Sequence, residues 1–215
     1  MQHALRAYGK GTALIKNIIF DVGDVLLSYR WEEMLTKDHG LSKERAHLIA
    51  GHMFSSPYWG IMDLGTETEE EVLFHWGQSF PDEVDDMRWF IEHCDLMPVP
   101  RPEVWAAVHQ LKEKGYHLYI LSNYSHYLFS HHTDGLPFMS DMDGMIVSYM
   151  VHRTKPDPYI YQYLLEKYSL KADECFFYDD RPENTAAAEA LGIRTFTVPK
   201  GDPQPLIDHI GTFLA

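Results

Sequence analysis

The stretch Asn17-Ile18-Ile19-Phe20-Asp21-Val22-Gly23-Asp24-Val25-Leu26-Leu27 decides the fold. Its apolar run from Ile18 to Phe20 is typical of a strand that is buried on both faces of a parallel sheet. The run ends on the carboxylate of Asp21, and open α/β sheets bind ligands beyond the carboxyl ends of their strands. We therefore expect Asp21 to project into a ligand-binding crevice, where Gly23 allows a close approach of the backbone.

Composition and charge limit the class of protein. The chain has 215 residues, 45% of them hydrophobic and 23% charged, which fits a globular protein with one core and a small accessory domain. The formal net charge of -14 argues against a nucleic-acid partner, which would call for a basic surface. An acidic surface would also repel a phosphorylated substrate, so a cation or a local positive charge must offset it.

Cysteines and apolar segments bear on location. Cys94 and Cys175 form no C-x-x-C pair, and Cys175 stands in an apolar run, which is typical of a buried side chain in a reducing compartment. Residues 1–16 have no continuous apolar core, so we expect no signal peptide. No stretch is long enough to span a bilayer. The sequence predicts a cytoplasmic protein without a membrane partner.

A helical block follows the first strand. Apolar residues fall at helical spacing in four segments, 31–39, 42–53, 68–79 and 81–94. The proline-rich tract 96–102 predicts a return hinge without regular structure. We therefore expect a helical cap domain over 31–97, inserted into a core formed by 15–30 and 98–215. Residues 1–14 are interpreted as an N-terminal extension.

Strands and helices alternate in the rest of the chain. We predict helices over 103–114, 158–168, 183–191 and 206–214, and strands over 117–121, 144–151, 174–178 and 194–198. Repeated βαβ units of this size indicate a parallel sheet flanked by helices. The fold class is therefore α/β, with a Rossmann-like parallel sheet and an inserted helical cap.

Polar residues follow three of the predicted strands, and a lysine stands in a fourth loop. They are Asp21, Ser122 with Asn123, Asp179 with Asp180, and Lys155. Because the carboxyl ends of parallel strands meet at one edge, these groups can converge on a single site. Clustered carboxylates favour a hard cation such as Mg²⁺. A lysine and a hydroxyl can bind phosphoryl oxygens.

In this order and on these elements, the four groups resemble the motifs of the haloacid dehalogenase (HAD) superfamily. The likeness covers residues 16–198, and the helical insert is similar to that superfamily's cap. One branch of the superfamily is resembled by the sequence Phe20-Asp21-Val22-Gly23 together with Lys155-Pro156 and the segment Asp179 to Asn184. That branch contains sugar-1-phosphate phosphatases and the amino-terminal phosphatase domain of soluble epoxide hydrolase. The resemblance implies a HAD-like fold and phosphatase activity.

The resemblance also implies roles for single residues. Asp21 would be the nucleophile and form an aspartyl-phosphate. Mg²⁺ would be held by the carboxylates of Asp21 and Asp180 and the main-chain carbonyl of Gly23. Asp179 would act through water or from behind these ligands, and Asn184 would steady them.

Three further positions would contact the phosphoryl group. Ser122 and the backbone of Asn123 would bind it, and Lys155 would neutralise charge on the nucleophile and on the transferring group. The implied substrate is a small phosphorylated metabolite, handled by a monomer or homodimer.

One position departs from the superfamily pattern. Most of its phosphatases carry, two residues after the nucleophile, an aspartate that protonates the leaving oxygen. Here that position is Gly23, and Asp24 comes one residue later, as a candidate for a displaced acid/base. Without this acid, good leaving groups would be favoured, which tilts the expectation toward a sugar 1-phosphate.

Other functions stay open. In a 2-haloacid dehalogenase Asp21 would attack carbon without a metal, which leaves Asp179-Asp180 unexplained. A phosphoglucomutase-like transferase would need the missing acid/base. A catalytically impaired binding or regulatory domain is supported only by Gly23. A two-component receiver domain has its acid pair before the phosphorylated aspartate, the reverse of the order here.

Overall fold

A computed structural model describes residues 13–215. The predicted N-terminal extension therefore lies almost wholly outside the described residues. Within them, no helix is long and apolar enough to cross a membrane.

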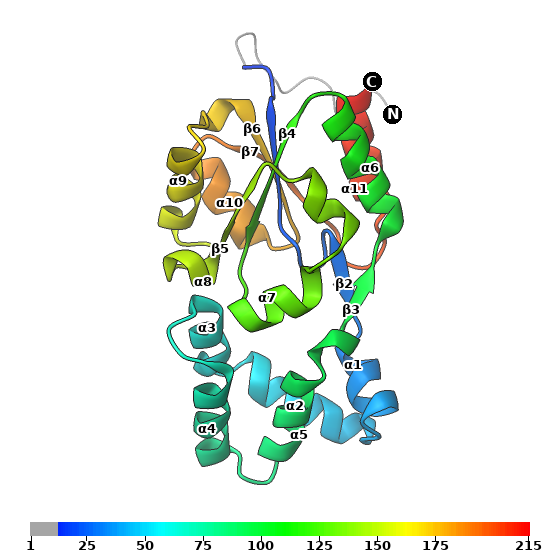
Figure 1. Cartoon of the computed structure of the whole chain (residues 1–215), viewed down its shortest axis with the longest axis vertical. Helices are drawn as coiled ribbons and strands as arrows, with labels where there is room; N and C mark the ends of the chain where they lie inside the picture. The colour runs from blue at the N-terminus through cyan, green and yellow to red at the C-terminus, as the bar shows by residue number, and fades with distance from the viewer. Residues whose placement is uncertain (1–12) are drawn as a thin grey trace.

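The core is a five-stranded parallel sheet with β1 at its centre (Figure 1). Its strands, in spatial order, are β5 (Gly144–Val147), β4 (His117–Ser122), β1 (Asn17–Phe20), β6 (Cys175–Asp179) and β7 (Arg194–Thr197). In the register, Phe20 lies between Ile120 of β4 and Tyr178 of β6. Asp21, Ser122 and Asp179 thus reach the same edge of the sheet, and the predicted fold class is confirmed.

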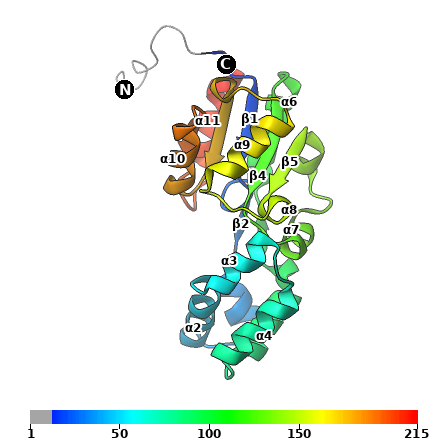
Figure 2. The same ribbon diagram turned by 90° about the vertical axis from the view of Figure 1, so that its left-hand side faces the viewer.

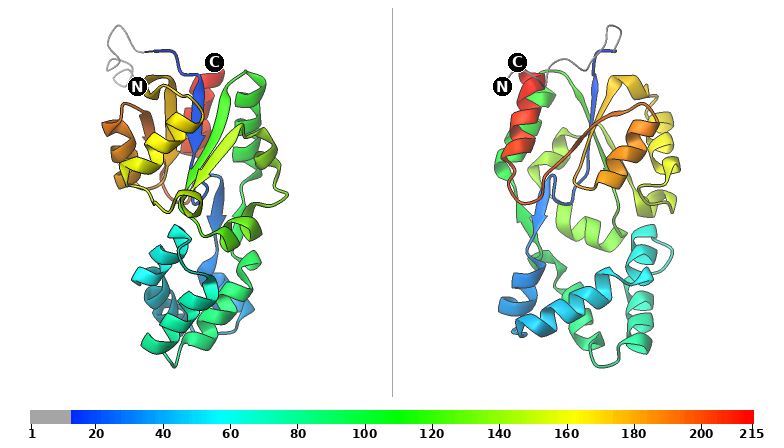
Figure 3. Two further views of the ribbon diagram at one scale, coloured as in Figure 1. Left: turned by 60° about the vertical axis from the view of Figure 1, so that its left-hand side comes forward. Right: turned by 180° about the vertical axis from the view of Figure 1, so that it is seen from behind.

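Helices cover both faces of the sheet. Figures 1 and 3 show α6 (Pro102–Glu113) and α11 (Gln204–Leu214) on one face, and α9 (Pro158–Lys167) and α10 (Pro182–Ala190) on the other. Side chains of a strand alternate between the two faces, so Phe20 packs in one apolar cluster and Ile19 in the other. Burial on both faces explains why Ile18, Ile19 and Phe20 form an unbroken apolar run in β1.

A helical block lies beyond the carboxyl ends of the strands (Figure 2). It consists of α1 (Trp31–Glu33), the π-helix η1 (Met34–Asp38), α2 (Lys43–Phe54), α3 (Pro57–Leu64), α4 (Glu69–Ser79), α5 (Val84–Glu92) and the 3-10 helix η2 (Cys94–Leu96). Helix α4 starts with a capping box between Thr68 and Glu71. This block is the segment predicted to be the cap.

An antiparallel ribbon joins this block to the sheet. Strand β2 (Leu27–Tyr29) pairs with β3 (Pro98–Pro100), and Ser28 lies opposite Val99. The prediction that the proline tract lacks regular structure was wrong here. Prolines are tolerated because a two-stranded ribbon leaves one side of each strand without a partner.

The remaining connections are short helices. These are α7 (His126–Thr133), η3 (Pro137–Asp141), α8 (Ser148–Val151) and η4 (Ala172–Glu174). The predicted strand 144–151 was half wrong, because β5 ends at Val147 and the chain turns at once into α8. Helix α3 was not predicted at all.

Candidate active site

Asp21 stands at the end of β1 with only 7% of its surface exposed. Its Oδ1 accepts hydrogen bonds from the Ser122 hydroxyl at 2.6 Å and the Val22 N–H at 2.8 Å, and Lys155 Nζ lies 3.0 Å away. Burial raises the pKa of Asp21 to about 6, opposed by Lys155 and Ser122 and reinforced by Asp179. Three donors therefore hold the carboxylate in place, and its burial increases its affinity for a proton.

Lys155 lies in the loop before α9 and connects two carboxylates. Its ammonium group contacts Asp179 Oδ2 at 2.6 Å and donates to the carbonyl of Leu121 at 2.9 Å. Burial lowers the pKa of Lys155, but the charges of Asp21 and Asp179 raise it more, so the net shift is upward. Lys155 is therefore protonated at neutral pH and stands between the two acids.

Asn123 holds the backbone of Lys155. The Lys155 N–H donates to Asn123 Oδ1 at 2.8 Å, and Asn123 Nδ2 donates to the Lys155 carbonyl at 2.9 Å. This amide clamp ties the end of β4 to the lysine loop. The side chain of Asn123 thus positions Lys155, in addition to the backbone role that the resemblance implies.

The end of β6 supplies the other acids. Asn184 Nδ2 donates to both oxygens of Asp179, at 2.9 and 3.1 Å, and the Arg181 N–H donates to Oδ1 at 2.8 Å. Asp180 Oδ2 lies 3.2 Å from Lys200 Nζ, and burial raises the pKa of Asp180 against the influence of Lys200. All of the predicted carboxylates but Asp24 gather here.

The donor set fits a hard divalent cation. Oxygens of Asp21, Asp179 and Asp180 lie within 4.8 Å of one another. Asn184 Oδ1 is buried and has no hydrogen-bond partner among the described residues. Buried oxygen atoms without donors, beside clustered carboxylates, match the preference of Mg²⁺ for oxygen ligands.

Gly23 and Asp24 diverge after Asp21. Gly23 lines the cavity above the nucleophile, next to the ring of Tyr29. Asp24, with φ at 52°, turns its carboxylate toward the hydroxyl of Ser28 at 3.5 Å and Lys200 Nζ at 3.7 Å. It is not among the described residues that line the cavity.

A cavity of about 340 Å³ opens over Asp21. Polar residues of the sheet edge line its floor, namely Asp21, Ser122, Asn123, Lys155, Arg181 and Asn184. Apolar and aromatic residues line its walls, namely Tyr29, Trp31, Phe54, Trp59, Met97, Tyr124 and Leu128. The helical block therefore covers the site with the aromatic side chains of Trp31, Phe54 and Trp59.

Asp63 at the end of α3 also lines this cavity, although it was not among the predicted site residues. Burial is the largest influence and raises the pKa of Asp63 to about 7. Arg181, the Ser125 N–H and Lys155 lower this pKa, and the charge of Asp21 raises it. The carbonyl of Asp63 accepts a hydrogen bond from Ser148 at 2.5 Å, which ties α3 to the core. Pro57 at a helix start and Gly65 after its end were signals that could have revealed α3.

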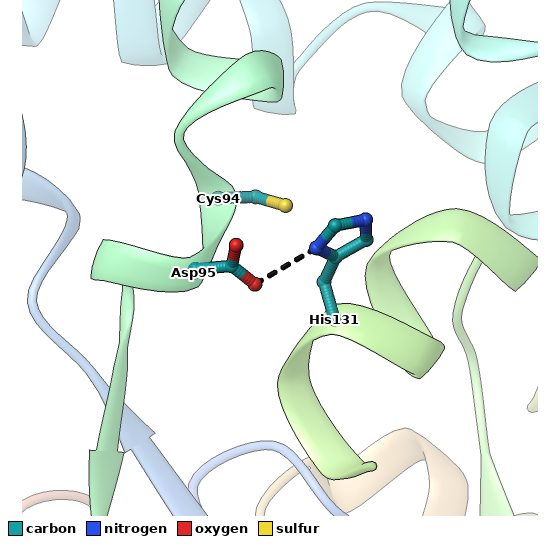
Figure 4. Close-up of side chains that lie close together, drawn as sticks. All are labelled: Cys94, Asp95 and His131. Atoms are coloured by element: carbon teal, nitrogen blue, oxygen red, sulfur yellow. Dashed lines mark hydrogen bonds and ion pairs between the residues drawn. The ribbon is translucent and has the colours of Figure 1, made fainter.

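A second polar cluster lies between η2 and α7 (Figure 4). Cys94, Asp95 and His131 offer ligand atoms within 4.8 Å of one another, and His131 pairs with Asp95 at 2.8 Å. Burial raises the pKa of the Cys94 thiol to about 12, so the thiol keeps its proton at neutral pH. We interpret the cluster as an ion pair beside a buried thiol.

Comparisons with known proteins identify relatives of this chain. A family model described as haloacid dehalogenase-like hydrolase matches residues 15–192. A D-ribitol-5-phosphate phosphatase of Bacteroides thetaiotaomicron is 30% identical over 94 residues, which is 41% of this chain and 46% of that protein. The chain thus matches under half the length of this relative. A sesquiterpene phosphatase of Aspergillus oryzae is 24% identical over 83% of this chain and 87% of that protein.

A solved structure shares the fold. It is an HAD-family enzyme of Bacteroides thetaiotaomicron in complex with magnesium and inorganic phosphate, with a TM-score of 0.69 and 24% identity. The match covers 87% of this chain and 96% of that one.

Proposed function

The chain belongs to the haloacid dehalogenase-like hydrolases, and from this premise we propose that it is a Mg²⁺-dependent phosphatase of a small phosphorylated metabolite. The observation that carries the proposal is the buried Asp21, joined to Asp179 through Lys155 beside the unpartnered Asn184 oxygen. Two relatives with phosphatase names, and a neighbour in complex with magnesium and phosphate, support it.

Asp21 would carry out the chemistry in two steps. Its carboxylate oxygen attacks phosphorus, an O–P bond forms, and the ester P–O bond breaks with its electron pair going to the leaving oxygen. Water then attacks the aspartyl-phosphate, releases inorganic phosphate and restores the carboxylate. The hydroxyl of Ser122, 2.6 Å from Asp21 Oδ1, would reach an oxygen of a phosphoryl group bound beside the nucleophile.

Charge is the main obstacle to this reaction. Lys155 keeps its proton between two acids and offsets the charge that a phosphoryl group brings. Asp21 and Asp180, with the Gly23 carbonyl, would hold Mg²⁺, while Asp179 and Asn184 would steady those ligands. When bound, the cation would neutralise charge on the phosphoryl oxygens. It would also keep the Asp21 carboxylate ionised at pH values below the raised pKa of the metal-free site.

Several finer statements remain predictions. The supply of the leaving-group proton is open, because Gly23 has no side chain and Asp24 turns toward Ser28 and Lys200. A sugar 1-phosphate as substrate, a cytoplasmic location, and a monomer or homodimer stay predictions. So does the division into a core domain and a cap over 31–97, with the cap closing on the site.

The test is hydrolysis of an aryl phosphate with and without Mg²⁺. We expect metal-dependent turnover by the wild type and a loss of at least about a thousandfold in Asp21→Asn. Asp208→Asn, an exposed aspartate on α11, is the matched control. Folded wild-type protein without turnover would reject the phosphatase proposal and favour a binding or regulatory domain. Turnover that needs no metal would reject the Mg²⁺ dependence, whereas halide release from a 2-haloacid without aryl phosphate turnover would favour the dehalogenase alternative.

A further inference from the structure

Three rings of the helical block form one wall of the active-site cavity. Trp31 of α1, Phe54 at the end of α2 and Trp59 of α3 all line it. Phe54 stands edge-to-face with both neighbours, with ring centroids 6.0 Å from Trp31 and 4.7 Å from Trp59. The rings thus present a continuous apolar surface to whatever extends from the phosphoryl group.

This wall is held in place from behind. Phe54 packs against the buried Phe90 at 6.0 Å, and Trp59 stacks on the buried Trp76 at 6.4 Å. Phe54 itself keeps 39% of its surface exposed, although its ring packs against Trp31, Trp59 and Phe90. The rings are fixed before a ligand arrives, so the exposed face is a preformed binding surface.

Polar groups are scarce away from the phosphoryl end. Of the described residues that line the cavity, Asp21, Ser122, Asn123, Lys155 and Asn184 belong to the sheet edge. Arg181 also stands at the sheet edge and is already paired with Glu183 at 2.6 Å. Away from that edge, the polar groups are the carboxylate of Asp63 and the hydroxyls of Tyr29 and Tyr124, which are hydrogen-bonded to each other. A polyhydroxylated group would lose water on entry and find few partners to replace it.

We propose that the substrate is a phosphate monoester of an apolar alcohol, whose hydrocarbon or aromatic group packs against Trp31, Phe54 and Trp59. The inference rests on the proposed phosphatase function and adds the substrate class. The cavity of about 340 Å³ suits a small organic group, since it lies at the low end of the range for small-molecule sites. The proposal opposes the expectation of a sugar phosphate.

A matched pair of substrates tests the proposal. Cyclohexylmethyl phosphate and glucose 6-phosphate both release a primary alkoxide from a six-membered ring, so they differ mainly in the hydroxyl groups. We expect kcat/KM to be at least about tenfold higher for cyclohexylmethyl phosphate. Equal values, or a preference for glucose 6-phosphate, would overturn the proposal.

Variants of the wall make the test independent of the leaving group. Phe54→Ala should lower the kcat/KM ratio of cyclohexylmethyl phosphate to acetyl phosphate about tenfold, and Phe54→Leu should restore most of it. Phe74→Ala, which removes an exposed ring on α4 outside the cavity, is the matched control and should leave the ratio unchanged. An unchanged ratio in Phe54→Ala would reject the wall as a binding surface.

Acetyl phosphate separates the two levels of failure. It has no large organic group, so its hydrolysis reports on Asp21 chemistry alone and shows that each variant is folded. Wild-type protein that does not hydrolyse acetyl phosphate would reject the phosphatase function. Hydrolysis of acetyl phosphate without a preference for the apolar ester would reject only the substrate class.

Discussion

The hydroxyl of Tyr29 lies beside Gly23, where a side chain on residue 23 would begin. A Cβ built on Gly23 would be 3.1 Å from both Tyr29 Oη and Cε2. Tyr29 is hydrogen-bonded to Tyr124, which contacts His132 Nδ1 at 3.2 Å, while His132 Nε2 donates to the Cys94 carbonyl at 3.1 Å. The place of the superfamily's usual aspartate is thus filled by a ring held in a buried network.

Restoring that aspartate alone should therefore fail. We expect Gly23→Asp to destabilise the protein by about 1–3 kcal/mol through overpacking, and to lower activity on alkyl phosphates. In a Tyr29→Ala background the same change should cost less, which a double-mutant cycle in urea unfolding would show. Higher alkyl-phosphate turnover by Gly23→Asp with wild-type stability would contradict this reading.

Lys155 should be essential for stability as well as activity. Lys155→Met leaves Asp21 and Asp179 buried and facing each other without a cation, so we expect a loss of about 3–5 kcal/mol in metal-free buffer. Millimolar Mg²⁺ should recover part of this loss, because it neutralises the same carboxylates. Thermal unfolding with EDTA or Mg²⁺ measures both effects.

Lys200→Met is the control for the lysine prediction. Lys200 also contacts two aspartates, Asp24 and Asp180, but its side chain is 71% exposed. Its removal should change stability little. A loss equal to that of Lys155→Met would mean that total charge, rather than the buried position, sets the effect.

Asp63 should make stability depend on pH. In the folded chain the pKa of Asp63 rises from an ordinary 3.8 to about 7, mainly because the side chain is buried. Arg181 lowers this pKa and Asp21 raises it. Between these values the folded state binds more protons than the unfolded state, so stability contributed by Asp63 is present below pH 4 and is lost as pH rises to 7. Asp63→Asn should remove this loss.

The measurement is the melting temperature of Asp63→Asn minus that of the wild type. We expect this difference to grow in favour of the variant from pH 5 to pH 8, while activity falls because a polar group of the cavity has changed. Asp85→Asn, an exposed aspartate on α5, should show no such trend. A difference independent of pH would show that Asp63 titrates normally.

The sequence predicted the sheet better than the cavity. Strand β1 could be predicted because a strand buried on both faces needs consecutive apolar residues, here Ile18, Ile19 and Phe20. The parallel topology then brings Asp21, Ser122 and Asp179 to one edge of the sheet. The same logic placed Lys155 near them. Positions fixed by topology can be predicted from the sequence.

The residues that form the walls of the active-site cavity are brought together by tertiary packing, which no local sequence pattern reveals. Helix α3 has eight residues and was overlooked, and with it Asp63. Tyr29 occupies the space beside Gly23 because β2 pairs with β3, a strand made of Pro98, Val99 and Pro100 whose composition argues against a strand. Local propensity was overridden there by pairing across some seventy residues of intervening chain.

Gly65 sets the distance between α3 and the core. A Cβ on Gly65 would lie 2.7 Å from Tyr149 Cβ and 3.0 Å from its Cα, so α3 would have to move away from α8. We expect Gly65→Ala to displace Asp63 and Trp59 relative to Asp21, and to lower kcat/KM for bulky phosphate esters about tenfold or more. Steady-state kinetics with cyclohexylmethyl phosphate measures this loss.

Gly40 provides a control with the same backbone demand. Gly65 has φ at +64° and Gly40 at +85°, so alanine at either position suffers the penalty of the left-handed region, about 1–2 kcal/mol. A Cβ on Gly40 meets nothing within 4 Å, so Gly40→Ala should show this penalty alone and keep wild-type kinetics. If both variants lost activity equally, contact between α3 and α8 would not control the site. If only Gly65→Ala loses it, the seating of α3 against Tyr149 determines how the aromatic wall meets the nucleophile.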